Sequence, residues 1–156
     1  MQPRVYVETS IPSFYHEGRT APDMVARRDW TRDWWDNRRQ GYLLVTSEAV
    51  LDELTRGDYP NKEKALLLIN DISLLEIDDP ITEIVEAYVR HKLMPQNPLG
   101  DALHLALASY YKCDFLLTWN CKHLANANKF DHIGRVNMLL GLYVPKLVTP
   151  LELLGG

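Results

Sequence analysis

The sequence lacks the cysteine content, the long apolar runs and the positive charge on which several classes of protein depend. Its two cysteines, Cys113 and Cys121, cannot form a disulfide framework, nor a four-ligand zinc site without other residues. No apolar run approaches the roughly 18 to 20 residues of a membrane span, and the first residues contain no apolar secretion signal. We therefore expect a cytoplasmic protein with reduced thiols and no membrane segment.

The net charge of the chain is also small. Lysine and arginine number 17 against 21 aspartates and glutamates, which gives a net charge of −4. This balance argues against a general basic nucleic-acid coat, but a carboxylate cluster that binds divalent cations is acidic only until it is loaded. With 46% hydrophobic and 24% charged residues, a chain of 156 residues suits one globular domain, and we expect residues 1–156 to form it.

Short apolar segments alternate with helical patterns along the chain. Continuous apolar runs such as 43–45 and 115–117 are typical of strands buried on both faces of a parallel sheet. We expect Pro12 to end the first strand segment, and Ser47 and Asp79 to cap the helices that follow them. The pattern predicts an α/β fold with a central, mainly parallel sheet. The predicted strands are 5–7, 42–46, 74–77, 115–118 and 146–148, and the predicted helices are 22–39, 48–55, 61–72, 79–91, 99–112 and 126–141, with a loop at 95–98.

Three acidic residues follow predicted strands or open predicted helices, where parallel sheets bind their ligands. Glu8 directly follows the first strand, Glu53 lies on the helix after the second, and Asp101 opens the helix rich in alanine and leucine. Thr118 and Asn120 lie at the end of the fourth strand. Mg²⁺ and Mn²⁺ prefer oxygen ligands, and such ions can neutralise a phosphodiester, activate water and stabilise the leaving oxygen. The sequence therefore predicts an acidic metal site suited to phosphodiester hydrolysis.

Each acid also has an ordinary explanation that spacing leaves open. Asp101 can be a helix N-terminal acid favoured by the helix dipole, and Glu53 can be a solvated helix position. Glu8 is harder to explain in this way, since a glutamate at the end of a buried strand is costly unless it is paired or liganded. A dinucleotide-binding fold would need a glycine-rich turn after the first strand, which residues 8–12 lack, so we set it aside.

Four segments resemble the motifs of PIN-domain nucleases, in the same order and over nearly the whole chain. Residues 5–12 are similar to the opening strand, where an acid is followed by Thr or Ser, and residues 45–54 to the second motif, whose glutamate precedes a leucine. Residues 100–106 closely resemble the Asp-Ala-Leu helix start of the third motif. Residues 116–124 resemble the fourth motif, a strand that ends in Thr and is followed by Asn or Asp. Each motif is weak alone, and the four together are fairly specific.

The resemblance implies a three-layer α/β/α sandwich that binds Mg²⁺ or Mn²⁺ and hydrolyses RNA. Many small proteins of this kind are VapC-like toxins of toxin–antitoxin pairs, often homodimeric and held inactive by a cognate antitoxin. The resemblance also implies that Glu8, Glu53 and Asp101 hold the metal. The residues implied to orient water or ligand are Ser10, Thr118 and Asn120.

Two positions depart from the pattern of the family. The first acid is usually aspartate, and the extra methylene of Glu8 extends the reach of its carboxylate by ~1.5 Å. The fourth motif often supplies another acid, but Asn120 and His123 stand at the two positions where it would lie. We hypothesise one well-held metal ion, with any second ion arriving with the substrate. A catalytically degraded domain that binds RNA or protein stays open as the alternative function.

Aromatic and basic residues alternate on the predicted helix 22–39. Its tryptophans can stack bases, but their helical spacing favours a packing or dimer role. Arg27 and Arg28 are candidates for contacts with phosphates or with an acidic antitoxin segment, and a solvated basic face is the ordinary alternative. His104 and His123 are further candidates for substrate binding, although a buried, hydrogen-bonded histidine is the more common case for His104.

Overall fold

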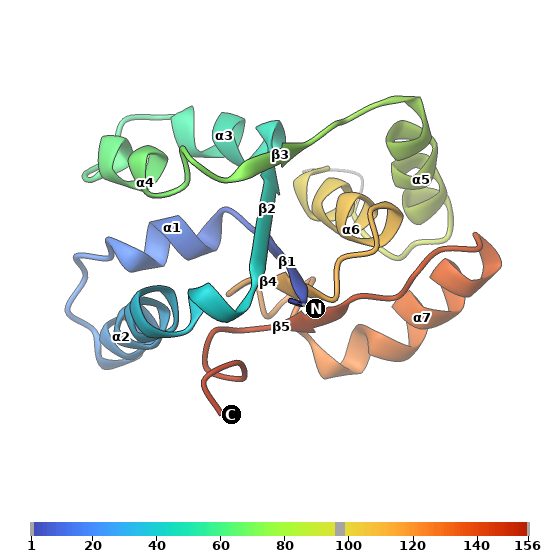
Figure 1. Cartoon of the computed structure of the whole chain (residues 1–156). Coiled ribbons are helices and arrows are strands. Elements are labelled where there is room, and N and C mark those ends of the chain that lie inside the picture. The colour runs from blue at the N-terminus through green and yellow to red at the C-terminus, as the bar shows by residue number, and fades with distance from the viewer. Residues whose placement is uncertain (1, 96–98, 156) are drawn as a thin grey trace.

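A five-stranded parallel sheet lies between two layers of helices in the computed structural model, which describes residues 2–95 and 99–155 (Figure 1). The strand order is β3-β2-β1-β4-β5, and every pairing between neighbours is parallel. This arrangement confirms the predicted α/β/α sandwich with its parallel sheet. The strands are β1 (Arg4–Val7), β2 (Leu43–Ser47), β3 (Ser73–Leu75), β4 (Phe115–Leu117) and β5 (Lys146–Val148).

The helices cover both faces of the sheet. In the view of Figure 1, α1 to α4 lie on one side of it and α5 to α7 on the other. None of the helices in the described ranges is long and apolar enough to cross a membrane. The helices are α1 (Ser10–Tyr15), α2 (Pro22–Asn37), α3 (Glu48–Thr55), α4 (Lys62–Leu68), α5 (Asp79–Arg90), α6 (Gly100–Tyr110) and α7 (Phe130–Leu139), with 3₁₀ turns at Arg39–Gly41 and Ala127–Lys129.

The strand order reverses between β1 and β4. From β1 the sheet continues through β2 to β3 on one side, and through β4 to β5 on the other. Val7 pairs with Leu117 across the two central strands, and the N–H of Glu8 donates to the Leu117 carbonyl at 3.2 Å. Glu8 and Thr118 therefore leave adjacent strands at the topological switch point, where open parallel sheets bind their ligands.

The core is built on the central strand and on the helices that cover it. Val5, Tyr6 and Val7 have no exposed surface, because β1 has a strand on each side and helices on both faces. Trp34 and Trp35 of α2 also belong to this core, which confirms the packing role favoured by their helical spacing.

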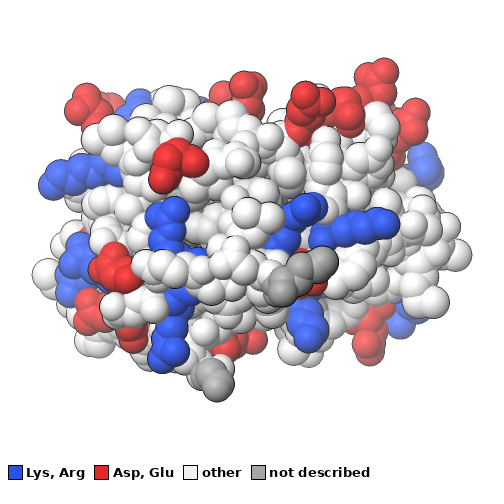
Figure 2. All heavy atoms as spheres, in the orientation of Figure 1, with Lys and Arg blue, Asp and Glu red and all other residues white. Residues whose placement is uncertain are grey.

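Charge is distributed unevenly over the surface. Figure 2 shows acidic side chains gathered over the segment that leads into α5, whereas Lys and Arg side chains lie across the middle of the same face. On this face acidic and basic side chains are therefore separated, so the small net charge of −4 does not describe the potential that a ligand would meet locally.

The helix α1 was not predicted, because Pro12 was expected to stop regular structure after the first strand. In the structure Pro12 occupies the third position of α1. A proline is tolerated there, since the N–H groups of the first turn have no partner within the helix. The consequence is important for the site, because α1 begins with Ser10, only two residues after Glu8.

Several predicted boundaries differ from the observed ones by a few residues. The helix predicted at 61–72 spans Lys62–Leu68, and the one predicted at 126–141 is a 3₁₀ turn followed by α7. Ser47 does stand at the N-cap of α3, but its hydroxyl makes no capping hydrogen bond. The cap position of α5 is Asp78, one residue before the predicted Asp79. Most of the predicted loop 95–98 lies outside the described residues.

The two free thiols differ in their surroundings, and we expect them to differ in reactivity. Cys113 is buried and Cys121 is exposed. Burial raises the pKa of the Cys113 thiol to about 12, so almost none of it is the reactive thiolate at pH 8. A disulfide reagent that releases a chromophore should therefore titrate one thiol in the native protein and two after denaturation.

The variant Cys121→Ser serves as the control for this titration. It should abolish the reaction of the native protein and leave one thiol titratable in guanidinium. Two native thiols that react at similar rates would contradict the described burial of Cys113.

Candidate active site

Glu8 places a buried carboxylate at the switch point. Its residue is 7% exposed, and its Oε1 atom accepts three hydrogen bonds. The donors are the backbone N–H of Ser10 at 3.1 Å, the Ser10 hydroxyl at 2.5 Å and the Thr118 hydroxyl at 2.6 Å. Buried carboxylates are costly without partners, and these donors from the start of α1 and the end of β4 stabilise an acid at this position.

Glu53 projects from α3 toward the same region and is held by two side chains. Its Oε1 atom lies 2.5 Å from the Thr9 hydroxyl and 2.5 Å from Nε2 of His104. Partial burial raises the pKa of Glu53, but the hydrogen bond and charge of His104 and the Thr9 hydroxyl outweigh this effect. The net pKa is below its ordinary value, so Glu53 is an anion at neutral pH.

His104 is completely buried, and each of its ring nitrogens has a partner. Nε2 contacts Glu53, and Nδ1 lies 2.7 Å from the Tyr6 hydroxyl, which in turn lies 2.7 Å from the Ser47 hydroxyl. Burial lowers the pKa of His104, but the hydrogen bond to Glu53 and the nearby carboxylate charges raise it above its ordinary value. This surrounding matches the buried, hydrogen-bonded histidine that was the ordinary interpretation of the sequence.

Asp101 lies in the first turn of α6 and is held by the end of β4. The Asn120 side-chain amide donates to its Oδ1 atom at 2.8 Å. The other end of the Asn120 amide, Oδ1, accepts from the backbone N–H groups of Lys122 and His123, at 3.2 and 3.0 Å. The amide orientation is therefore fixed, with its N–H₂ group toward Asp101.

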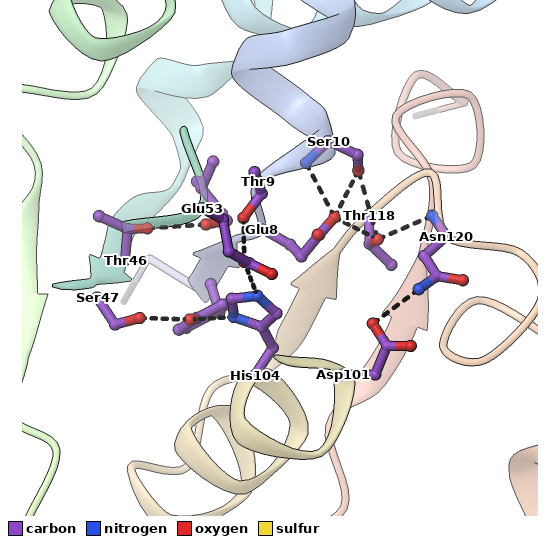
Figure 3. A network of polar contacts seen from close by, with 12 residues as sticks. Glu8, Thr9, Ser10, Thr46, Ser47, Glu53, Asp101, His104, Thr118 and Asn120 are labelled. Carbon is purple, nitrogen blue, oxygen red and sulfur yellow. Dashed lines mark hydrogen bonds and ion pairs between the residues drawn. The ribbon is translucent and has the colours of Figure 1, made fainter. Parts of the chain in front are cut away.

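The three carboxylates share one arrangement, which Figure 3 shows from close by. In Glu8, Glu53 and Asp101 one oxygen receives the hydrogen bonds just described. The second oxygen receives none from residues 2–95 or 99–155. Donors that hold one oxygen and leave the other available are typical of the outer shell of a metal site.

These residues fit a hard divalent cation. Ligand atoms of Glu8, Glu53 and His104 lie within 4.8 Å of one another, but the His104 nitrogen nearest to Glu53 is occupied by its hydrogen bond. That leaves carboxylate oxygens as the available donors, which suits Mg²⁺ or Mn²⁺ better than zinc. Asp101 stands beside Asn120, outside the 4.8 Å group.

Gly100 leaves room for the carboxylate of Glu53. A Cβ atom at this position would lie 2.7 Å from Oε2 of Glu53, the oxygen that has no donor among the described residues. Carbon and oxygen do not approach so closely without a shift, and Glu53 is held on its other oxygen by Thr9 and His104. A glycine here is therefore required by the position of the acid, not by the backbone of α6.

The remaining predicted binding residues differ in their surroundings. The Arg27 guanidinium lies over the rings of Phe14 and Trp119, at 5.7 and 5.3 Å from their centroids. Arg28 instead pairs with its neighbour Asp29 at 3.1 Å. Trp30 stacks on Trp119, so this tryptophan also packs within the chain. His123 contributes its backbone N–H to Asn120.

Sequence reasoning missed four residues that hold the site. Thr9 and Gly100 meet Glu53, and Tyr6 and Ser47 act through His104. All of these contacts join residues that are distant in the chain. The one signal available was the glycine directly before Asp101, at the start of a helix where glycine is otherwise unfavourable.

The fold and the acidic site together define a class of protein. A parallel α/β/α sandwich with three carboxylates at its switch point is the arrangement expected of a metal-dependent nuclease. The PIN domain model matches residues 5–127, so the chain belongs to the PIN-domain family, whose members are generally metal-dependent nucleases. No curated protein matches the chain.

The close approach of Gly100 and Glu53 predicts the effect of a single methyl group. Gly100→Ala should displace the Glu53 carboxylate, because this is the flexible group that the Cβ meets. We expect Mn²⁺ affinity to fall about ten-fold or more, the usual effect of disturbing the support of a metal ligand. Isothermal titration with Mn²⁺ measures it.

Gly134→Ala is the matched control, since Gly134 lies within α7 and its Cβ would meet nothing within 4 Å. This variant should gain about 0.5 to 1 kcal/mol of stability and bind Mn²⁺ as the parent does. Equal Mn²⁺ affinities of the two variants would show that Gly100 does not make room for a metal ligand.

Proposed function

We propose that this PIN-domain protein is a metal-dependent endoribonuclease. The observation that supports the proposal best is the shared arrangement of Glu8, Glu53 and Asp101. Each presents one carboxylate oxygen that accepts no hydrogen bond from the described residues, at the switch point of a parallel sheet. A domain that had lost catalysis would have no need to hold three acids in this way, at the cost of burying one of them.

In this proposal Glu8, Glu53 and Asp101 hold Mg²⁺ or Mn²⁺ through their free oxygens. The bound ion supplies the charge that stabilises the transition state and lowers the pKa of water. In hydrolysis an oxygen of water bonds to phosphorus while the bond from phosphorus to the leaving oxygen breaks. The protein's own contribution is orientation: Ser10 and Thr118 fix Glu8, and Asn120 fixes Asp101.

Arg27 is the side chain that we propose for contact with a substrate phosphate. It makes no salt bridge with any described acid, and its guanidinium is oriented by the rings of Phe14 and Trp119. Trp119 follows Thr118, so Arg27 is tied to the end of β4 where Glu8 is held. Arg28, His104 and His123 are weaker candidates, because Arg28 is paired with Asp29 and His104 is buried.

We also propose that the ribonuclease acts as the toxin of a toxin–antitoxin pair, on cytoplasmic RNA, as a homodimer. The resemblance of the four motifs to small VapC-like toxins supports this role. The exposed apolar side chains of Met138 and Leu139, 76% and 75% exposed on α7 and its end, provide surface that a second copy can cover. An antitoxin would act by blocking the acidic site or the arginines of α2.

The central test is cleavage of RNA by a variant with one acid neutralised. Asp101→Asn keeps an oxygen for the Asn120 hydrogen bond but removes a metal ligand. We expect cleavage of a mixed single-stranded RNA pool to fall at least about a hundred-fold, since several kcal/mol of charge stabilisation depend on the metal. Cleavage is measured separately with Mg²⁺, with Mn²⁺ and with EDTA, and a single-stranded DNA pool is tested in parallel with the RNA.

Asp131→Asn is the control, because Asp131 is the second residue of α7 just as Asp101 is the second residue of α6. Equal losses in both variants would mean that Asp101 serves only the helix dipole. Absence of both cleavage and Mn²⁺ binding in the parent would favour the degraded domain. Growth arrest on expression of the parent, but not of Asp101→Asn, tests the toxin role.

Asn120 allows a separate test of the number of metal ions. Asn120→Asp replaces the donor to Asp101 by a carboxylate about where the amide nitrogen lies, 2.8 Å from Oδ1. Two like charges at this distance repel each other, so the variant should be less stable without metal and gain more stability from Mn²⁺. Equilibrium dialysis should find one Mn²⁺ ion in the parent and two in the variant.

Thermal unfolding with and without Mn²⁺ provides the second readout for this variant. Two tightly bound ions in the parent without RNA would overturn the single-metal hypothesis. An identical Mn²⁺-dependent shift of the melting temperature in parent and variant would show that position 120 does not face the metal.

A further inference from the structure

A chain of buried hydroxyl and imidazole groups leads from β2 to the carboxylate of Glu53. Ser47, Tyr6 and His104 have no exposed surface. Their contacts are Ser47 Oγ to Tyr6 Oη at 2.7 Å, Tyr6 Oη to His104 Nδ1 at 2.7 Å and His104 Nε2 to Glu53 Oε1 at 2.5 Å. The three residues belong to β2, β1 and α6, so three elements converge on one oxygen of α3.

The Tyr6 hydroxyl holds the His104 ring through Nδ1, the nitrogen that does not face Glu53. The Glu53 carboxylate can only accept, so Nε2 donates to it. In the neutral ring, a hydroxyl that donates to Nδ1 leaves the proton on Nε2, where it faces Glu53. In the charged ring, Nδ1–H donates to the same hydroxyl, and Nε2 again has its proton. The Ser47 hydroxyl completes the second hydrogen bond of Tyr6 in both cases. Nε2–H therefore donates to Glu53 whether or not the ring is charged.

Without the Tyr6 hydroxyl, the His104 ring loses the hydrogen bond that fixes its rotation. Nε2 would no longer be held in line with the Glu53 Oε1 atom, which it meets at 2.5 Å. The Glu53 carboxylate would keep only the Thr9 hydroxyl as a fixed donor and could rotate. The free oxygen of Glu53 would then leave its place beside Gly100.

The hydrogen bond between Ser47 and Tyr6 has a cost for the helix α3. Ser47 is the N-cap residue of α3, but its side chain makes no capping hydrogen bond. A serine at this position ordinarily caps its own helix. Here the Ser47 hydroxyl contacts Tyr6 instead. The helix that carries Glu53 therefore lacks a side-chain cap, and Tyr6 has a second hydrogen-bond partner.

We infer that Ser47, Tyr6 and His104 are positioning residues, which hold Oε1 of Glu53 and thereby direct Oε2 to the metal. The inference rests on the metal-binding role proposed for Glu53. It assigns a function to a tyrosine in the centre of the sheet, which would otherwise count as core.

Mn²⁺ affinity of the protein with and without the Tyr6 hydroxyl tests the inference. Tyr6→Phe should lower the affinity about ten-fold, the usual effect of a lost outer-shell partner. Tyr88→Phe is the control. Tyr88 is equally buried and its hydroxyl also has two partners, Ser109 and Asn137, neither of which belongs to the site. This variant should lose stability in urea and keep its Mn²⁺ affinity within about two-fold.

Two substitutions of His104 separate positioning from packing. Glutamine places an amide donor near the site of Nε2, whereas asparagine places it near Nδ1. His104→Gln should keep Mn²⁺ affinity within about three-fold of the parent, and His104→Asn should lose about ten-fold. In the His104→Gln background, Tyr6→Phe should have little further effect, because glutamine has no nitrogen at the site of Nδ1 for the Tyr6 hydroxyl to hold.

The outcomes are distinguishable from failure of the proposed function. A parent protein that binds no Mn²⁺ overturns the metal site, and with it the inference. A parent that binds Mn²⁺ overturns the inference alone if Tyr6→Phe has the parental affinity or if Tyr88→Phe weakens binding as much. The same holds if the loss caused by Tyr6→Phe persists in the His104→Gln background.

Discussion

The site depends on the stabilisation of one buried carboxylate, that of Glu8. A charged group at the end of the central strand would cost several kcal/mol if it had no partners, by the general estimate of about 1 to 3 kcal/mol or more for each unsatisfied buried group. The three hydrogen bonds to its Oε1 atom come from the start of α1 and the end of β4. The carboxylate of Glu8, at the end of β1, therefore joins β1, α1 and β4 at the switch point. The Ser10 hydroxyl extends this junction, because it also accepts the Trp119 N–H at 2.8 Å.

The hydrogen bonds that hold one oxygen of each acid also explain how the protein accommodates its two departures from the family pattern. Glu8 is longer than aspartate, and its Oε1 atom is far enough from the backbone to meet both Ser10 and Thr118. Asn120 is neutral, and it can donate to Asp101, which a carboxylate at that position could not do without a proton. Glu8 thus uses its extra length to accept hydrogen bonds from two elements, and Asn120 supplies a hydrogen bond in place of a charge.

The sequence predicted the features that depend on local pattern. Continuous apolar runs predicted strands close to those observed, and the rule that ligands bind at the carboxyl ends of parallel strands drew attention to Glu8 at the end of the first strand. Pro12 misled the prediction of α1, because a proline that stops a strand is equally suited to a first helical turn.

The support of the acids could not be predicted from the sequence. The hydrogen bond between Tyr6 and His104 joins residues 98 positions apart, and that between Thr9 and Glu53 joins residues 44 positions apart. Propensity and periodicity carry no information on such pairs. Ser47 shows the limit most clearly, since its position at the N-cap was correct and its hydrogen-bond partner was not the helix.

The exposure of Cys121 gives the protein a natural attachment point beside its acidic site. The residue follows Asn120 directly and carries an accessible thiol, while the other cysteine is enclosed in the core. A fluorophore coupled to this sulfur would sit next to the amide that orients Asp101, with no engineered cysteine and no change to the acids. The wild-type chain can thereby report, through the emission of a single dye, whether the proposed RNA substrate or antitoxin reaches the end of β4.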